Sequence, residues 1–191
     1  MMIAGVDEAG RGPLAGPVVC SAVILPASFH LLGLNDSKKL SAKQREKLFD
    51  EIQKQAVAFS IVFVGPKEID SYNILQATLL GMTRAIEQLS IAPSLALIDG
   101  NKIPMNLPCS ARAIIKGDSK EQCIMAASIL AKVSRDRYMD ALHTSFPQFG
   151  FAQHKGYPTA QHIKAINAHG VCPEHRKSYA PVQKALIKHS A

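Results

Sequence analysis

The hydrophobic residues of this chain fall into short continuous runs and into longer stretches with helical spacing. The short runs are rich in valine and isoleucine, and glycine, proline or polar residues bound them. They predict five strands, at Met2–Val6, Val18–Leu25, Ala56–Val64, Leu95–Asp99 and Ala111–Ile115. Three strands, followed by helices interleaved with two more strands, indicate an α/β domain with a mixed sheet.

Apolar positions three and four residues apart predict the helices. Ser41 has the properties of an N-cap, and Gln44 completes a capping box for a helix that ends at about Gln55. After a short turn that begins at Pro66, a second helix is expected from Asn73 to about Ser90. A third, long helix is expected from Ser119 to about Leu142, with small residues that allow close packing on the sheet.

The rest of the chain is expected to be helical pieces and loops. Helical pieces are predicted at Ala160–Ala168 and Pro181–Ile187. We therefore expect a single domain over residues 1–191, with an α/β core over about 1–145 and a C-terminal helical segment over about 146–191.

Composition and charge narrow the class of protein. Hydrophobic residues make up 47% of the 191 residues, which is enough for a sizeable core without disulfide bonds. The formal net charge is +7, and the basic residues are spread from Arg11 to Lys188. Such a surface suits a polyanionic partner, although many proteins are mildly basic for no such reason.

The four cysteines contain no CxxC pair, which argues against a zinc ribbon and against a secreted disulfide scaffold. The N-terminal residues do not resemble a signal peptide, and no stretch is long and apolar enough to cross a bilayer. We expect a cytoplasmic, monomeric protein that does not bind a membrane.

Four acidic residues lie at or just after the predicted ends of core strands: Asp7, Glu8, Asp99 and Asp118. Strand ends can hold carboxylates together rigidly, and paired Mg²⁺ ions need such hard oxygen ligands. Taken singly, each acid could equally form a turn or cap a helix, as Asp118 could for the long helix. The cluster as a whole favours a metal site.

The adjacent pair of acids carries a geometric condition. Neighbouring strand residues point to opposite faces of a sheet, so Asp7 and Glu8 share one site only if the strand ends between them. Gly10 and Gly12 nearby make such a break plausible.

Residues 10–15, GRGPLA, also match the relaxed dinucleotide-binding pattern GxGxxG/A. That pattern requires a helix to follow, whereas Pro13 and Pro17 precede a β-branched strand run. No phosphate-binding P-loop is present either, so a nucleotide-cofactor enzyme is disfavoured.

Seven ordered blocks over nearly the whole chain resemble the ribonuclease HII (type 2 ribonuclease H) family. They are DEAGRGPLAGPVV (7–19), NDSKKL (35–40), LIDG (97–100), KGD (116–118), AASILAKVSRD (126–136), HKGYPT (154–159) and HRKSYAP (175–181). Tyr179 departs conservatively from the phenylalanine that is frequent in the family. The resemblance implies a ribonuclease H-like fold, with a central five-stranded mixed sheet, flanking helices and a C-terminal helical segment.

The resemblance also implies an activity. Members cleave the RNA strand of RNA/DNA hybrids endonucleolytically, and single ribonucleotides embedded in duplex DNA are the other substrate expected. Two Mg²⁺ or Mn²⁺ ions would activate water, so that the cut falls 5′ of the ribonucleotide and leaves a 3′-hydroxyl and a 5′-phosphate. A rival hypothesis is a nucleic-acid-binding module without hydrolysis, but clustered carboxylates would repel one another without cations.

Site residues follow from the same resemblance. Asp7, Glu8 and Asp99 would be the metal ligands, with Asp118 as the fourth acidic member of the catalytic site. The backbone of Gly10, Arg11 and Gly12 would read the ribose 2′-hydroxyl, since glycine allows close approach. Tyr157 would stack at the junction between ribonucleotide and deoxyribonucleotide; without the resemblance, a half-buried tyrosine before Pro158 would be the preferred interpretation.

Further roles are assigned to charged residues. The candidate phosphate contacts are Lys38, Lys39, Lys116, Lys155, Arg176 and Lys177. A solvated face is preferred for Lys43, Arg45 and Lys47, and a structural ion pair with a neighbouring arginine for Asp136.

The C-terminal histidines do not have the spacing of metal ligands, so surface or packing roles are expected for His154, His162, His169 and His175. Residues 183–187 faintly resemble a sliding-clamp motif, but a helix end explains them better.

Overall fold

The computed structural model describes residues 1–31, 33–35 and 37–190. Within these ranges, the centre of the molecule is a mixed sheet of five strands in the order β3-β2-β1-β4-β5. The strands are β1 (Ile3–Ala9), β2 (Val18–Ile24), β3 (Ala58–Val64), β4 (Leu95–Asp99) and β5 (Ser110–Ile114). β1, β4 and β5 run parallel, and β2 is antiparallel to both β1 and β3. The five-stranded mixed sheet that the sequence predicts is confirmed.

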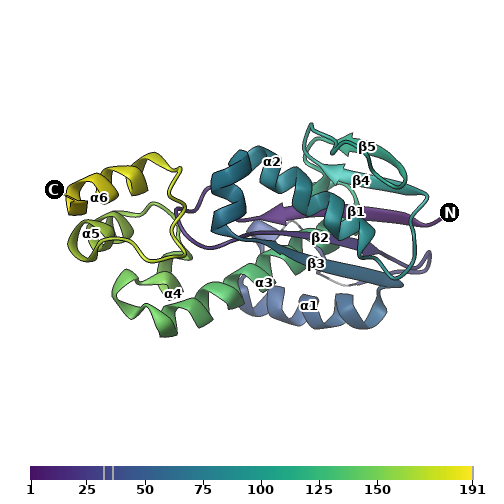
Figure 1. Ribbon diagram of the computed structural model, residues 1–191. Helices are drawn as coiled ribbons and strands as arrows, with labels where there is room; N and C mark the ends of the chain where they lie inside the picture. The colour runs from purple at the N-terminus through teal and green to yellow at the C-terminus, as the bar shows by residue number, and fades with distance from the viewer. Residues whose placement is uncertain (32, 36, 191) are drawn as a thin grey trace.

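Helices cover both faces of this sheet (Figure 1). α2 (Pro66–Glu87) lies on one face, and α3 (Gln122–Ser145) and α1 (Ala42–Gln55) lie on the other. α3 sits close to β1 because Gly5 has no side chain: a Cβ there would lie 2.1 Å from the carbonyl carbon of Cys123. The capping box of α1 is present, with Gln44 N–H donating to the Ser41 hydroxyl.

α2 begins earlier than the sequence suggests. The turn expected at Pro66 is wrong, because Pro66 occupies the first helical turn, where its missing N–H costs nothing. The helix expected from Asn73 does start there, as the second part of α2. Asn73 adopts φ 66°, and its side chain accepts the N–H groups of Leu75 and Gln76, so it kinks the helix and caps the new segment.

Two element ends near the acids also differ from the prediction. β1 continues to Ala9, past both acids, because its pairing with β2 extends to the Ala9–Val19 position. α3 begins at Gln122 and not at Ser119, since a short 3₁₀ turn, η2 (Gly117–Ser119), comes first. Asp118 is therefore part of this turn and does not cap α3.

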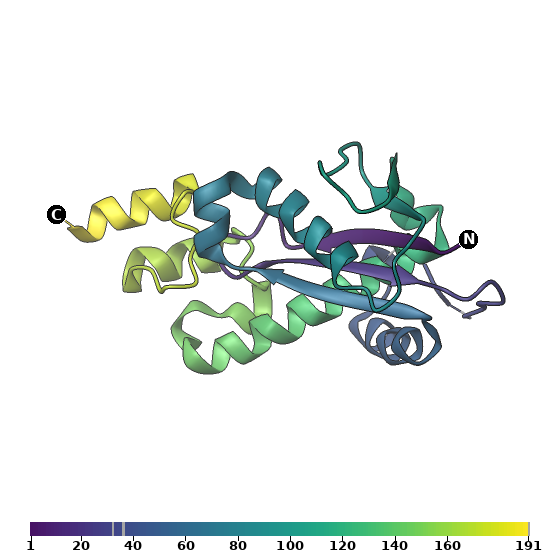
Figure 2. The same cartoon turned by 45° about the vertical axis from the view of Figure 1, so that its right-hand side comes forward.

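The chain after α3 forms a helical piece beyond one end of the sheet (Figure 1 and Figure 2). It contains η3 (Pro147–Phe149), α4 (Phe151–His154), α5 (Ala160–His169) and α6 (Ala180–Ser190). Its apolar core is centred on Phe149, Phe151, Ile166 and Val182. Residues 183–187 lie within α6, as the helix interpretation expects. No helix in the described part of the chain is long and apolar enough to span a membrane.

Three histidines are buried in this core, in agreement with the packing role expected of them. His175 Nε2 and His162 Nε2 are 3.0 Å apart, and the N–H of Cys172 donates to His175 Nδ1. This assigns the proton of His175 to Nε2 and that of His162 to Nδ1, which lies 3.0 Å from the Tyr157 carbonyl. Burial lowers the pKa of His162 and of His175 to about 4, so both rings are neutral at pH 7.

Candidate active site

Asp7 lies in the middle of the molecule, on the face of the sheet that α3 covers. Ala4 and Val6 pack toward α2, so the alternation of the strand directs Gly5 and Asp7 to the opposite face. Asp7 is 4% exposed, and one of its carboxylate oxygens accepts the Glu8 N–H at 2.7 Å.

Asp99 and Asp118 reach the same place through a turn between β5 and α3. Asp99 ends β4, the parallel neighbour of β1, and its Oδ1 accepts the N–H groups of Gly117 (2.7 Å) and Asp118 (3.3 Å). Lys116 turns the chain with a left-handed backbone, φ 57°. Carboxylate oxygens of Asp7, Asp99 and Asp118 consequently lie within 4.8 Å of one another.

This cluster is electrostatically unfavourable without cations. Burial, followed by the charges of Glu8 and Asp99, raises the pKa of Asp7 well above its usual range. Lys38 offers partial compensation, with its Nζ 3.2 Å from Asp118 Oδ2. Converging hard oxygen donors of like charge fit Mg²⁺ or Mn²⁺, which prefer carboxylate and water ligands.

Glu8 does not meet the geometric condition stated for it. The strand does not end between Asp7 and Glu8, so the expectation of a break there is wrong, and Glu8 starts from the face that α2 covers. Burial raises the pKa of Glu8, and Asp99 adds to this effect, whereas Arg11, with Nη1 at 3.6 Å from Oε1, lowers it. Glu8 nevertheless lines the same hollow as Asp7 and interacts with the charge of Asp99, although its oxygens are not among those that lie within 4.8 Å of one another.

A hollow of about 240 Å³ opens beside the acids. Its walls contain several residues expected at the site, together with polar residues of η1 (Ser37–Lys39) and α3. The lining residues are Asp7, Glu8, Ala9, Gly10, Arg11, Gly12, Ser37, Lys38, Asp99, Ser128, Lys132 and Tyr157. The structure therefore brings Asp7, Glu8 and Asp99 together with the glycine-rich segment and Tyr157 around one hollow.

The glycine-rich segment leads from β1 into β2. A strand and not a helix follows it, as the argument against a dinucleotide site requires. The ring of Tyr157 lies next to Gly12: a Cβ on that glycine would be 3.5 Å from Cε1 of the tyrosine. Tyr157 is 42% exposed, so its ring is accessible at the mouth of the hollow.

The candidate phosphate contacts separate into three groups. Lys38, Lys39, Lys116 and Lys177 are exposed. Lys155 is half-buried and paired with Asp140. Arg176 is 0% exposed, and the structure corrects its assignment: its guanidinium donates to backbone carbonyls of the 10–16 segment and to the Tyr179 hydroxyl, so it does not face solvent where a phosphate would lie.

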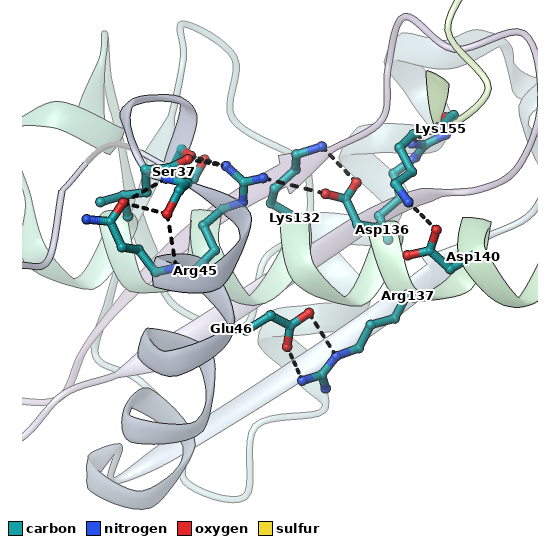
Figure 3. A network of polar contacts seen from close by, with 12 residues as sticks. Ser37, Arg45, Glu46, Lys132, Asp136, Arg137, Asp140 and Lys155 are labelled. Carbon is teal, nitrogen blue, oxygen red and sulfur yellow. Dashed lines mark hydrogen bonds and ion pairs between the residues drawn. The ribbon is translucent and has the colours of Figure 1, made fainter. Parts of the chain in front are cut away.

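A polar network behind the hollow was missed by the sequence reasoning (Figure 3). Arg45 was expected on a solvated face, but its side chain is 14% exposed and donates to the carbonyls of Ser37 and Leu40. Asp136 pairs with an arginine, as expected, but this is Arg45 of α1 at 3.9 Å and not a neighbour in the sequence; it also pairs with Lys132 at 2.7 Å. The (i, i+4) spacing of Lys132 and Asp136 was the available signal for the lysine, which lines the hollow.

Asp36, within the NDSKKL block, lies outside the residues that the structure describes. Its neighbour Ser37 is held by a hydrogen bond between its hydroxyl and that of Ser128, 2.9 Å apart. η1, which carries Lys38 and Lys39, is therefore attached to α3 beside the acids.

Comparison with known proteins places this geometry in a family. The family model described as ribonuclease HII matches residues 4–182. Ribonuclease HII 1 of Methylibium petroleiphilum is 57% identical over 190 residues, which cover 100% of this chain and 96% of the relative. A ribonuclease HII of Vibrio cholerae is 58% identical over 185 residues, which cover 97% of this chain and 89% of the relative.

Solved structures show the same fold. The ribonuclease H2 of Pyrococcus horikoshii OT3 superposes with a TM-score of 0.84 at 28% identity, covering 100% of this chain and 98% of that one. The RNase HII of Archaeoglobus fulgidus, solved in a complex with PCNA, superposes with a TM-score of 0.78 at 29% identity, covering 94% and 95% of the two chains.

Proposed function

The chain belongs to the ribonuclease HII family, and we propose that it cleaves the RNA strand of RNA/DNA hybrids and nicks duplex DNA on the 5′ side of single ribonucleotides. The observation that supports this function most strongly is the convergence of Asp7, Asp99 and Asp118, because Asp7 and Asp99 line the same hollow as the glycine-rich segment. The carboxylates can hold cations next to a phosphate, and the glycine-rich segment can contact the sugar beside that phosphate.

Asp7, Asp99 and Asp118 would hold the cations, with Glu8 as a further ligand from the other face of the sheet. We propose Mg²⁺ or Mn²⁺, two ions in the catalytic state. The chemistry that such a pair supplies is the activation of a water for in-line attack and the stabilisation of charge on the leaving oxygen.

The chain's own residues would select and orient the duplex. The backbone of Gly10, Arg11 and Gly12 would contact the 2′-hydroxyl, since no side chain on the two glycines blocks approach. The accessible ring of Tyr157 would stack on the sugar or base at the junction. Exposed Lys38, Lys39 and Lys116 would contact phosphates, which position the duplex without reading its sequence.

The 2′-hydroxyl is read in this mechanism and is not the nucleophile. A 2′-oxygen attack needs an acid and a base beside the sugar, commonly histidines. Among the described residues, those that line the hollow include no histidine, and burial lowers the pKa of all three buried histidines near Tyr157. The expected products are therefore a 3′-hydroxyl and a 5′-phosphate.

The experiment is cleavage of a labelled DNA duplex that contains one ribonucleotide. With Mg²⁺ or Mn²⁺ we expect one nick on the 5′ side of the ribonucleotide, and no cutting with excess chelator or of an all-DNA duplex. A 2′,3′-cyclic phosphate would contradict the water mechanism. Efficient cutting of the all-DNA duplex would contradict the ribonuclease assignment while leaving the metal site in place.

A further inference from the structure

Two buried arginines lie beneath the glycine-rich segment. Arg135 of α3 is 1% exposed and Arg176 is 0% exposed. Burial, together with the charge of nearby Arg176, lowers the pKa of Arg135 to about 10, so it remains a cation at neutral pH. A buried guanidinium is costly unless its donors are satisfied. Here the donors are satisfied largely by backbone carbonyls, which ties both side chains to the path of the chain.

Arg176 makes the contacts closest to the segment that would read the sugar. Its Nη2 donates to the Gly10 carbonyl at 2.6 Å, and its Nη1 donates to the Arg11 carbonyl at 3.0 Å. Its Nε donates to the Gly16 carbonyl at 2.9 Å, at the far end of the same segment. The Tyr179 hydroxyl gives the Arg11 carbonyl a second donor at 2.7 Å.

These contacts fix the direction of two amides. The peptide bonds of the described chain contain no cis form, and in a planar trans peptide the C=O and the following N–H point in opposite directions. With the carbonyls of Gly10 and Arg11 held on Arg176, the N–H groups of Arg11 and Gly12 point away from it. Gly10, Arg11 and Gly12 line the hollow, whereas Arg176 does not.

We propose that Arg176 is a positioning residue for sugar recognition: by holding the carbonyls of Gly10 and Arg11, it directs the N–H groups of Arg11 and Gly12 toward the ribose 2′-hydroxyl. This role rests on the proposed function, and it makes Arg176 the side chain on which discrimination between ribose and deoxyribose depends. Two adjacent N–H donors that already point in the required direction would bind the ribose 2′-oxygen without reorganisation. Deoxyribose lacks this oxygen and would gain nothing from them.

Arg135 supports the same segment from α3. It donates to the carbonyls of Ala15 (3.1 Å) and Pro17 (2.9 Å), and also to that of Lys155 (2.9 Å), two residues before Tyr157. Its guanidinium carbon lies 5.9 Å from the centre of the Tyr157 ring. The segment and the tyrosine are therefore attached to one buried cation, which fixes their separation.

The test compares Arg176→Lys with the wild type in two measurements on the Mg²⁺-loaded enzyme. The first is kcat/KM on a duplex with one ribonucleotide. The second is the inhibition constant of the matching all-DNA duplex, with its salt dependence. A lysine keeps the charge, but its donors share one nitrogen and cannot replace the three separate nitrogens that hold the three carbonyls. We therefore expect kcat/KM to fall by about tenfold or more, as for lost charge-assisted hydrogen bonds. The inhibition constant should stay within about twofold.

Arg84→Lys is the matched control, because Arg84 lies on α2, 38% exposed, and pairs with Glu68. It should change neither quantity. If Arg176 contacts a phosphate instead, the all-DNA inhibition constant rises in parallel with KM and its salt slope changes by about one; that result overturns the proposal. An unchanged kcat/KM in Arg176→Lys overturns it as well.

A second variant covers the case in which Arg176→Lys does not fold. Tyr179→Phe removes one of the two donors to the Arg11 carbonyl, together with one acceptor of Arg176 Nη1, and keeps the bonds of Arg176 to the three carbonyls. We expect kcat/KM on the ribonucleotide-containing duplex to fall by about threefold, the low end for one neutral hydrogen bond, with an unchanged inhibition constant. Equal activity on both duplexes by the wild type would contradict the proposed function itself, independently of either variant.

Discussion

Replacing Asp7 by asparagine should abolish cleavage and, at the same time, stabilise the metal-free protein. Asp7 is 4% exposed, and its carboxylate oxygen lies within 4.8 Å of those of Asp99 and Asp118. Two unit charges 4.8 Å apart repel by about 3.5 kcal/mol at an effective dielectric constant of about 20. Asparagine removes this repulsion, and its amide oxygen can still accept the Glu8 N–H.

Relaxation of the site reduces the gain. We expect a net stabilisation of about 1–2 kcal/mol, which raises Tm by about 2–8 °C for a chain of this length. The measurement is thermal unfolding in chelator at pH 7.5, with Asp50→Asn on the exposed side of α1 as the control that should not move Tm. Added Mg²⁺ should stabilise the wild type more than Asp7→Asn, because the variant has lost a ligand.

The pH dependence of this difference is a further check. Because the pKa of Asp7 is higher in the folded protein than in the unfolded chain, the unfolded chain loses its proton first as the pH rises. The wild type therefore loses stability from about pH 4 up through the raised pKa, and Asp7→Asn does not. The gap in Tm should be absent near pH 4 and should widen as the pH rises toward 7.5. A destabilised Asp7→Asn protein at pH 7.5, or full activity in it, would refute the repulsion argument.

Three further outcomes are expected. Tyr157→Ala should slow cleavage at a single ribonucleotide more than cleavage of a long hybrid, because stacking worth about 1–3 kcal/mol is partly replaced by other contacts on the hybrid; equal losses would indicate a structural role. Gly10→Ala should lower the free energy of unfolding in urea by about 2–4 kcal/mol, since its φ is 97° and a Cβ would lie 2.0 Å from Arg135 Nε. Gly33→Ala, with φ 86° but nothing within 4 Å, should cost only about 1 kcal/mol, and equal costs would exclude the steric explanation. Because burial lowers the pKa of His162 to about 4, the unfolded chain takes up this proton first and stability is lost as the pH falls from about 6.5 toward 4; His162→Gln should flatten that loss of Tm, and an unchanged profile would exclude His162 as its source.

The parts of the site that the sequence predicts are those that local pattern determines. Asp99 was placed correctly because the apolar run of β4 ends at that residue and a glycine follows. The capping box predicted the start of α1 for the same reason, since both partners lie within one turn. Such signals need no knowledge of which strands are neighbours.

The errors concern properties that only the tertiary structure determines. Whether β1 ends between Asp7 and Glu8 depends on how far β2 pairs with it, and this pairing continues to Ala9. Arg45 and Arg176 look like any exposed basic residues in the sequence. Most of their partners are carbonyl oxygens, which every residue has, so no sequence pattern indicates that Arg176 is buried and Arg45 largely so.

The boundary predicted at about residue 145 does not separate a catalytic unit from an accessory helical segment. The acids belong to the sheet and to the turn before α3, but the segment that would read the sugar is held from both sides. Leu14 N–H donates to the Gly156 carbonyl at 2.8 Å, Gly16 N–H to the Glu174 carbonyl at 2.9 Å, and Arg176 N–H to the Leu14 carbonyl at 2.8 Å. Bonds from the C-terminal piece thus complete the course of residues 10–16, and the same piece carries Tyr157. The sheet and the turn before α3 bring the three aspartates together, whereas the proposed discrimination of RNA from DNA would require the C-terminal piece to be folded against them.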